Sequence, residues 1–244
     1  MLPVASVDLI EKRSLQERVD SKFVLALSRV PDLLDGLESH YARICQGEKI
    51  QGAYRTLYYD TEDFRCLRDH ERGRRPRFKV RFRHHVDRGL SFLEVKKRCL
   101  NESTVKSRWP MPFGFERMDE KNQERVRQVS PLSAEHLLTT LRVDFDRMTL
   151  VGIETEERIT IDTGIVFTSS SGFYQWPQLV IVEVKQARLA QRTPIMQALR
   201  QMEAAPHAIS KYCLGARLVL PEASTEWYAE QVEFLKGELG KVGL

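Results

Sequence analysis

The sequence predicts an α+β fold in which an antiparallel eight-stranded β-barrel forms a tunnel and helices pack outside it. Two features of the chain carry this prediction. Segments in which apolar and charged residues alternate recur along the chain, and the side chains of a strand point alternately to the two faces of a sheet. Many of these segments follow one another across short turns, which is typical of antiparallel strands. We expect one domain over residues 1–244, with a core at about 17–220 and a C-terminal helix at 221–240.

The first strand is expected at residues 17–27 and is followed by a helix at 31–47, because proline suits a first helical turn and glycine a C-terminal cap. Aromatic and β-branched residues predict a second strand at 52–60. The same patterns predict the remaining elements along the chain. They are a short helix at 62–70, strands at 77–86, 90–98 and 103–110, a helix at 119–141 interrupted at Pro131, strands at 141–152, 157–167 and 178–186, a helix at 194–204 and a last helix opened by Pro221.

The composition indicates a soluble protein with an uneven distribution of charge. Hydrophobic residues make up 42% of the chain and charged residues 30%, and the net charge is +4. Between Arg65 and Arg108, 15 Lys and Arg residues stand against 5 Asp and Glu residues, an excess larger than the net charge of the whole chain. A concentrated basic segment of this kind is typical of proteins that bind an anionic partner.

Other features of the sequence bear on its location in the cell. No apolar run reaches the roughly 20 residues of a membrane helix, and the N-terminal residues lack the apolar region of a signal peptide. The four cysteines are scattered along the chain, which favours free thiols in a reducing compartment. We therefore expect a cytoplasmic protein that does not insert into a membrane, although it could work with a membrane-protein partner.

The most regular strand is the one at 77–86, where Lys79, Arg81 and Arg83 share one face. A single stripe of this kind is typical of a solvated sheet face. Similar spacings recur on other strands. They are Arg18 with Lys22, Glu94 with Lys96, Lys106 with Arg108, Arg158 with Asp162 and Glu183 with Lys185. Because like charges on one face repel each other without a counter-ion, the recurrence favours stripes that face inward and line a basic lumen.

A phosphate chain is the ligand class that fits such a lumen. Arginine binds phosphate oxygens through two parallel hydrogen bonds and lysine binds them as a point charge. An isolated acid among these cations is a candidate ligand for Mg²⁺ or Mn²⁺, which take oxygen ligands and bridge phosphates. Glu183 is the best candidate, with an ion pair to Lys185 or to an arginine of the lumen as the alternative. For Glu94 an ion pair is the preferred interpretation.

Two other functions of the basic segment are less consistent with its pattern. A nucleic-acid binder would stack bases on Phe78, Phe82 and Phe92, but we place these rings on the face opposite the cations and therefore expect no nucleic-acid partner. The adjacent His84 and His85 point to opposite faces of their strand, which disfavours a metal site made by the pair.

Ordered motifs between Glu17 and Gly215 resemble the VTC domain, the polyphosphate polymerase branch of the triphosphate tunnel metalloenzymes, in its prokaryotic stand-alone form. The motifs are ERVDSKF, TLYYDTEDF, FKVRFRHH, FLEVKKR, VKSRW, VDFDR with ERITIDTGI, IVEVK and ISKYCLG. The resemblance implies transfer of a phosphoryl group from a nucleoside triphosphate, with ATP expected, to a growing inorganic polyphosphate chain. It also implies a requirement for Mn²⁺ or Mg²⁺.

The resemblance assigns roles to individual residues. Ser210 and Lys211 are implied to lie at the transferred phosphate and to act in catalysis with Arg81 and Arg83, and Glu183 is implied to be the metal ligand. The phosphate-binding residues expected from the stripes and the resemblance together are Lys22, Lys79, Arg81, Arg83, Lys96, Lys106, Arg147, Arg158 and Lys185.

Two alternatives stay open beside the polymerase. One is a triphosphatase that hydrolyses tripolyphosphate or nucleoside triphosphates, and the other is a non-catalytic polyphosphate-binding module. The opening segment ERVDSK has only Asp20 where simpler members of the superfamily have a second acid. Fewer metal-binding acids argue against RNA triphosphatase and adenylate cyclase activities.

Overall fold

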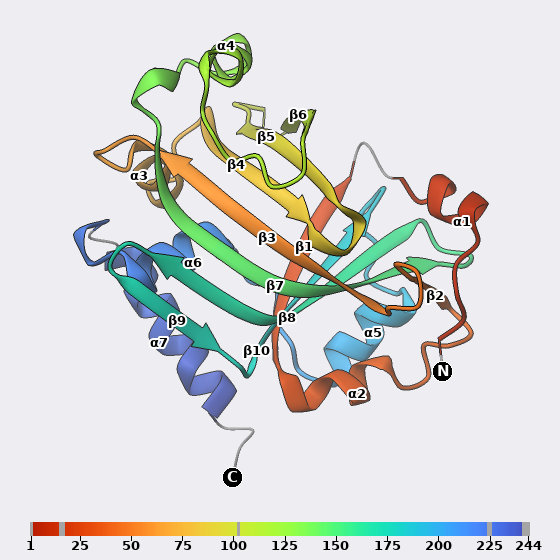
Figure 1. Cartoon of the computed structure of the whole chain (residues 1–244). Coiled ribbons are helices and arrows are strands. Elements are labelled where there is room, and N and C mark those ends of the chain that lie inside the picture. Colours follow the sequence, from red (N-terminus) through yellow and green to blue (C-terminus); the bar gives the residue numbers. More distant parts are fainter. Residues whose placement is uncertain (1, 15–17, 102, 224–225, 241–244) are drawn as a thin grey trace.

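The computed structural model describes residues 2–14, 18–101, 103–223 and 226–240. Within these residues it contains ten strands and seven α-helices, which confirms the predicted α+β class (Figure 1). The strands are β1 (Val19–Ala26), β2 (Tyr41–Ile44), β3 (Gln51–Asp60), β4 (Arg77–His85), β5 (Leu90–Arg98), β6 (Thr104–Met111), β7 (Leu138–Gly152), β8 (Glu157–Ser169), β9 (Gly172–Trp176) and β10 (Leu179–Gln186). The α-helices are α1 (Val7–Lys12), α2 (Val30–Leu34), α3 (Arg65–Glu71), α4 (Glu120–Val129), α5 (Pro194–Gln201), α6 (Lys211–Val219) and α7 (Glu226–Gly240).

All ten strands belong to one antiparallel sheet. Its main path runs β1-β10-β8-β7-β3-β4-β5-β6, with β2 paired to β7 and β9 paired to β8. Among the described residues, the two end strands β1 and β6 do not pair with each other. The predicted eight-stranded barrel is therefore not closed, and the sheet has ten strands and is curled but open.

Two features of the edge strands explain why the sheet stays open. The free edge of β1 is covered by the segment before α6, where the backbone N–H of His207 donates to the carbonyl of Lys22 at 2.7 Å and Phe23 bridges to Pro206. On the other edge, Pro110 of β6 has no N–H to donate to a neighbouring strand.

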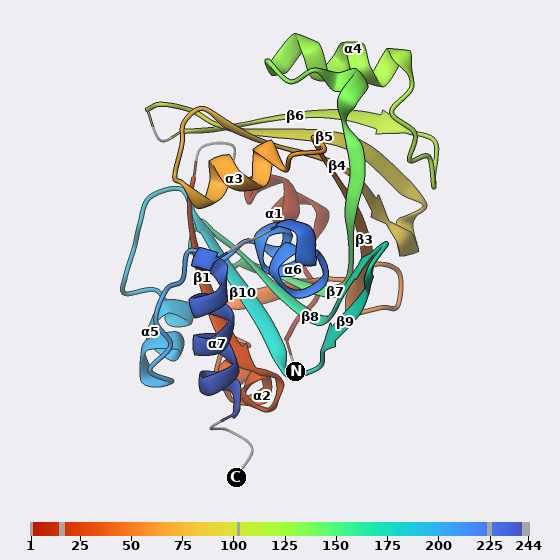
Figure 2. The same ribbon diagram turned by 90° about the vertical axis from the view of Figure 1, so that its left-hand side faces the viewer.

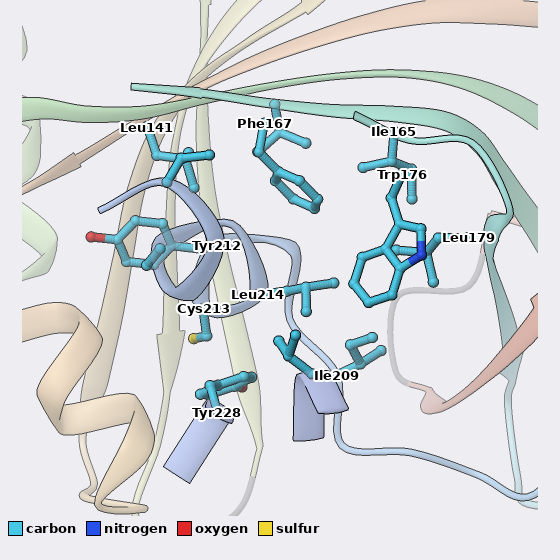
Figure 3. Close-up of a cluster of buried hydrophobic side chains, with 14 of the residues drawn as sticks. Leu141, Ile165, Phe167, Trp176, Leu179, Ile209, Tyr212, Cys213, Leu214 and Tyr228 are labelled. Carbon is cyan, nitrogen blue, oxygen red and sulfur yellow. The ribbon is translucent and has the colours of Figure 1, made fainter. Parts of the chain in front are cut away.

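Three apolar clusters hold the fold together. Helices α2 and α5 cover the outer face of β1, β8 and β10, and α4 covers the outer face of β4 and β5. The third cluster lies inside the curl of the sheet, where α6 packs against β7 and β8 and is backed by α7 (Figure 2). In Figure 3, Leu141 and Phe167 of the sheet lie over Tyr212 and Leu214 of α6, with Tyr228 of α7 on the other side.

Several predicted elements have different bounds in the structure. The helix expected at 31–47 ends at Leu34, because Gly36 adopts a positive φ of 73° and residues 41–44 pair with β7 as β2 instead. The helix expected at 119–141 ends at Val129, before Pro131, and β7 begins at Leu138. The predictions named neither β9 nor α6, and residue 17 of the first predicted strand lies outside the described residues.

The four cysteines carry free thiols, as the sequence predicts. In the described parts of the chain, no helix combines the length and the apolar character needed to cross a membrane.

Candidate functional site

The charged stripes of β4, β5 and β6 lie side by side on the concave face of the sheet. The strand register places Arg81, Glu94 and Arg108 in one row and Lys79, Lys96 and Lys106 in the next. Alternate residues of these strands, such as Phe82 and Leu93, are buried on the other face beneath α4. Two contacts with the start of α6, which lies inside the curl, show that the basic face is the concave one. Lys79 of β4 contacts Ser210, and Asp162 of β8 contacts Lys211. We call the space enclosed by this face the lumen.

Glu94 is the counter-ion of the cations on β4 and β6. Its side chain is 1% exposed, and its Oε2 lies 2.8 Å from Nε and 2.7 Å from Nη2 of Arg81. Its Oε1 lies 2.6 Å from Nζ of Lys106, in an ion pair without hydrogen-bond geometry, and 3.4 Å from Nε of Arg108. Burial alone would raise the pKa of this carboxyl, but Arg81, Arg83 and Lys106 hold it well below its usual range. Glu94 is thus an ion-pair partner, the interpretation preferred from the sequence.

Asp162 is the counter-ion on the opposite wall of the lumen. Its oxygens accept hydrogen bonds from Nε and Nη2 of Arg147 at 2.5 and 2.7 Å, and from Nζ of Lys211. Burial opposes ionisation, yet Arg147 and Lys211 lower the pKa of Asp162 to about 2. The sequence places Asp162 in a stripe with Arg158 but indicates no role for it, because nothing local in the sequence shows that α6 reaches this strand.

Glu183 lies in the same wall and is the predicted metal ligand. Its Oε2 accepts a hydrogen bond from Nζ of Lys185 at 2.5 Å, so the ion pair considered from the sequence is present. Its Oε1 lies 3.7 Å from Nζ of Lys22, which is beyond hydrogen-bond distance. In the described residues, no cluster of three or more acids, histidines and cysteines could hold a metal alone. A divalent ion at Glu183 would therefore need further oxygen ligands, and phosphate oxygens commonly supply these to Mg²⁺.

Helix α6 is fixed inside the curl by a buried polar contact and by close packing. The hydroxyl of Tyr212 donates to Asp60 at 2.7 Å, and Asp60 also accepts the backbone N–H groups of Cys66 and Leu67 at the start of α3. On the sheet side, Gly215 lies so close to Phe167 that a Cβ at this glycine would be 2.4 Å from a ring carbon. These contacts direct the N-terminal end of α6 into the lumen.

Ser210 and Lys211 stand at that N-terminal end. The Ser210 side chain does not cap the helix, and its Oγ accepts a hydrogen bond from Nζ of Lys79 at 2.7 Å. His70 of α3 lies 3.4 Å from the same Nζ, and burial together with the surrounding cations lowers the pKa of His70 to about 2, so its ring is neutral. Backbone N–H groups at a helix N-terminus favour anions. The predicted catalytic pair thus forms the inner end of the lumen.

The lysines of the lumen repel each other. Burial, and then the neighbouring Lys22 and Lys79, lower the pKa of Lys96 to about 7. Burial is also the main reason why the pKa values of Lys79 and Lys106 fall to about 8. A bound polyanion would raise these pKa values, because it would place opposite charge beside the lysines.

Aromatic rings support several of these cations. The guanidinium carbon of Arg147 lies 5.2 Å from the ring centres of both Tyr54 and Phe145, and that of Arg108 lies 3.3 Å from the ring centre of Phe92. The prediction that Phe92 lies opposite the cations is wrong, because Phe92 shares the face of Glu94 and Lys96. Phe78 and Phe82 do lie on the other face, in the apolar cluster beneath α4.

The outer part of the lumen is a cavity of about 260 Å³. Its lining includes Arg83, Glu94, Arg108, Arg147 and Lys185. A second cavity, of about 300 Å³, lies elsewhere, between Arg55, Arg142 and hydroxyl side chains of β7 and β8. Its two arginines already pair with one carboxylate, that of Asp144, at 3.0 and 2.8 Å, so we do not regard it as a phosphate site.

The structure brings the predicted residues together around one space. The lumen and its ion-pair networks contain Lys22, Lys79, Arg81, Arg83, Lys96, Lys106, Arg147, Arg158, Glu183, Lys185, Ser210 and Lys211. They also contain Arg108, Asp162, His70 and Tyr54, for which the sequence predicts no role. Arg108 and Asp162 stood in the charged stripes, so strand periodicity was the signal that could have found them.

Comparison with known proteins agrees with this architecture. The family model described as the VTC domain matches residues 17–220, and no curated protein matches the chain. A candidate adenylate cyclase from Bacillus halodurans has a TM-score of 0.53 at 12% identity, over 80% of this chain and 94% of that one. A candidate adenylyl cyclase from Hippeastrum, described with a dominant triphosphatase activity, has a TM-score of 0.53 at 11% identity, over 82% and 95%. At such low identity these likenesses concern the fold alone.

Proposed function

The chain belongs to the VTC domain family, and from this premise we propose that it transfers a phosphoryl group from a nucleoside triphosphate, with ATP expected, to a growing inorganic polyphosphate chain. The observation that carries the proposal is the lumen, in which the cations outnumber the acids Glu94, Asp162 and Glu183. A polyanion is the ligand that this excess favours. The free thiols suit a reducing, cytoplasmic setting.

The lumen suits phosphoryl transfer because that reaction depends mainly on positioning and on stabilising charge. Arg81 and Arg83 would hold oxygens of the donor triphosphate along the wall. Lys211, Ser210 and the first N–H groups of α6 would surround the phosphate that is transferred. The paired acids keep the arginines in fixed orientations, so little reorganisation is needed when the substrate binds.

Glu183 would hold a divalent ion, Mn²⁺ or Mg²⁺, through the oxygen that faces Lys22. When bound, such an ion supplies positive charge at the phosphate oxygens and favours departure of the nucleoside diphosphate. Lys185 donates to the other oxygen of Glu183 and thereby keeps the carboxylate ionised and oriented.

A second candidate is hydrolysis of the triphosphate with water as the acceptor. The observation that favours it is the similarity in fold to the Hippeastrum protein, for which a dominant triphosphatase activity is described. The same lumen residues would bind the substrate in both reactions, so the acceptor decides between them. A binding module without turnover is the third outcome to be tested.

One experiment separates the three. The purified chain is incubated with ATP and Mn²⁺, and the products are resolved on a polyacrylamide gel and assayed for free phosphate. Long phosphate chains support the polymerase, and free phosphate without chains supports the triphosphatase. If neither forms while polyphosphate raises the melting temperature, the chain is a binding module.

The role of Glu183 is tested by Glu183→Gln, which keeps the shape of the side chain and removes its charge. We expect metal-dependent turnover to fall about 10²-fold or more. Losing even a residue that hydrogen-bonds to a metal ligand commonly lowers metal affinity or activity by about 10- to 100-fold. Glu124→Gln is the matched control, since Glu124 is 56% exposed on α4 and pairs with Arg127 and Gln128 of its own helix. Full activity of Glu183→Gln would rule out the metal assignment.

A further inference from the structure

A cation and a ring are stacked at the outer end of the lumen. Arg108 of β6 lies over Phe92 of β5, with its guanidinium carbon 3.3 Å from the ring centre. The side chain of Arg108 is 39% exposed, whereas those of Arg81 and Arg83 on β4 are 14% and 12% exposed. One face of the Arg108 guanidinium is thus covered by Phe92, and the rest of the group borders the cavity.

Neighbouring aromatic rings hold this stack in place. The His85 ring lies 5.5 Å from that of Phe92 and 4.5 Å from that of Tyr54. Burial, with Arg83 and Arg108 nearby, lowers the pKa of His85 to about 3, so the ring is neutral. Its Nε2 lies 3.3 Å from Nη2 of Arg108 and can therefore accept a hydrogen bond from it. The guanidinium is fixed by Phe92 below, by His85 at its side and by Glu94 at 3.4 Å.

The distance along the lumen is suited to a nucleotide. Phe92 and Lys96 are four residues apart on β5, which corresponds to about 13 Å in a strand. Lys96 pairs in register with Lys79, and Lys79 contacts Ser210 at the inner end. A triphosphate with its terminal phosphate at Ser210 therefore extends outward past Glu94, and its nucleoside lies near Arg108.

We infer that Arg108 and Phe92 form a platform on which the nucleobase of the triphosphate substrate stacks. The inference rests on the proposed function, because it assumes that the lumen binds a nucleoside triphosphate. Planar guanidinium groups stack on bases, and a base stacked in this way is held by its face and not by its edge. Consequently the site distinguishes adenine from guanine little and binds purine nucleotides more tightly than pyrimidine nucleotides.

The test compares ATP with tripolyphosphate, which has the same charged chain and no base. Dissociation constants for both are measured by calorimetry with the wild type, Arg108→Lys and Phe92→Leu. Lysine keeps the charge beside Glu94 but loses the plane, and leucine keeps an apolar side chain but loses the ring. We expect ATP affinity to fall by at least about fivefold in each variant, which is about 1 kcal/mol, and tripolyphosphate affinity to change by less than about twofold.

The chain provides a matched control. Arg117 lies over Phe115 at 5.8 Å outside the lumen, so Arg117→Lys removes a similar contact and should change neither affinity. Equal losses for ATP and tripolyphosphate, or no loss for either, would overturn the platform while leaving the proposed function intact. If the wild type binds neither compound, the proposed function itself fails. Should Phe92→Leu not fold, Arg108→Lys alone decides the question.

Discussion

The buried Glu94 offers the sharpest test of how the lumen is stabilised. Replacing it with glutamine keeps the size of the side chain and removes the charge that neutralises Arg81 and Lys106. Breaking a buried ion pair by removing one partner costs about 3–5 kcal/mol. We take the lower end, about 3 kcal/mol, because Lys106 and Arg108 are each more than a third exposed and solvent screens them. For a chain of this size that corresponds to a fall in melting temperature of about 6–12 °C.

The assay is thermal unfolding with and without tripolyphosphate. A ligand at 100 times its dissociation constant stabilises the folded state by about 2.7 kcal/mol. Because Glu94→Gln leaves Arg81 and Lys106 without their carboxylate, we expect tripolyphosphate to raise the melting temperature of the variant more than that of the wild type. The matched control is Glu135→Gln, since Glu135 forms an exposed pair with Arg127 worth less than about 1 kcal/mol.

Two results would refute this reasoning. If Glu94→Gln melts within about 2 °C of the wild type, the carboxylate does not hold the cations together in the free protein. If tripolyphosphate stabilises the variant less than the wild type, Glu94 is itself part of the binding site, as a metal ligand would be.

Three further predictions follow from the lumen and from α6. Affinity for tripolyphosphate should fall as the pH rises from about 6.5 to 9, because Lys96 and Lys79 have pKa values of about 7 and 8 in the free protein and must be protonated to bind phosphate. Bound phosphate raises both pKa values, so calorimetry in buffers of different ionisation enthalpy should show proton uptake on binding at pH 8. Binding without proton uptake would contradict this. Gly215→Ala should destabilise the fold by about 1–3 kcal/mol in urea unfolding, because the new methyl group meets Phe167, and an unchanged midpoint would show that α6 can shift. Asp60→Ala should cost about 2 kcal/mol or more in the same measurement, since it removes an acceptor from buried N–H groups and from a buried hydroxyl; a loss below about 0.5 kcal/mol would mean that water replaces it.

Strand periodicity determined much of what the sequence shows about this protein. Alternation placed Lys79, Arg81 and Arg83 on one face of β4, and the structure agrees because a strand side chain cannot change face without a shift in register. The same rule already assigned Phe92 to the face of Glu94, since the two are two residues apart. Phe78 and Phe82 belong to β4, a different strand, and pairing of the two strands places Phe92 opposite Arg83.

Tertiary structure alone decided how these faces are combined. Periodicity says which residues share a face but not which strands meet, so it could not show that the edges of β1 and β6 stay apart. Nor could it show that α6 enters the curl of the sheet. That packing brings Ser210 to Lys79, 131 residues away in the chain, and Lys211 to Asp162, 49 residues away. The charged stripes, with Glu94 among them, were thus visible in the sequence. The inner end of the site and the pairing of Asp162 with Lys211 depend on long-range packing that no local pattern encodes.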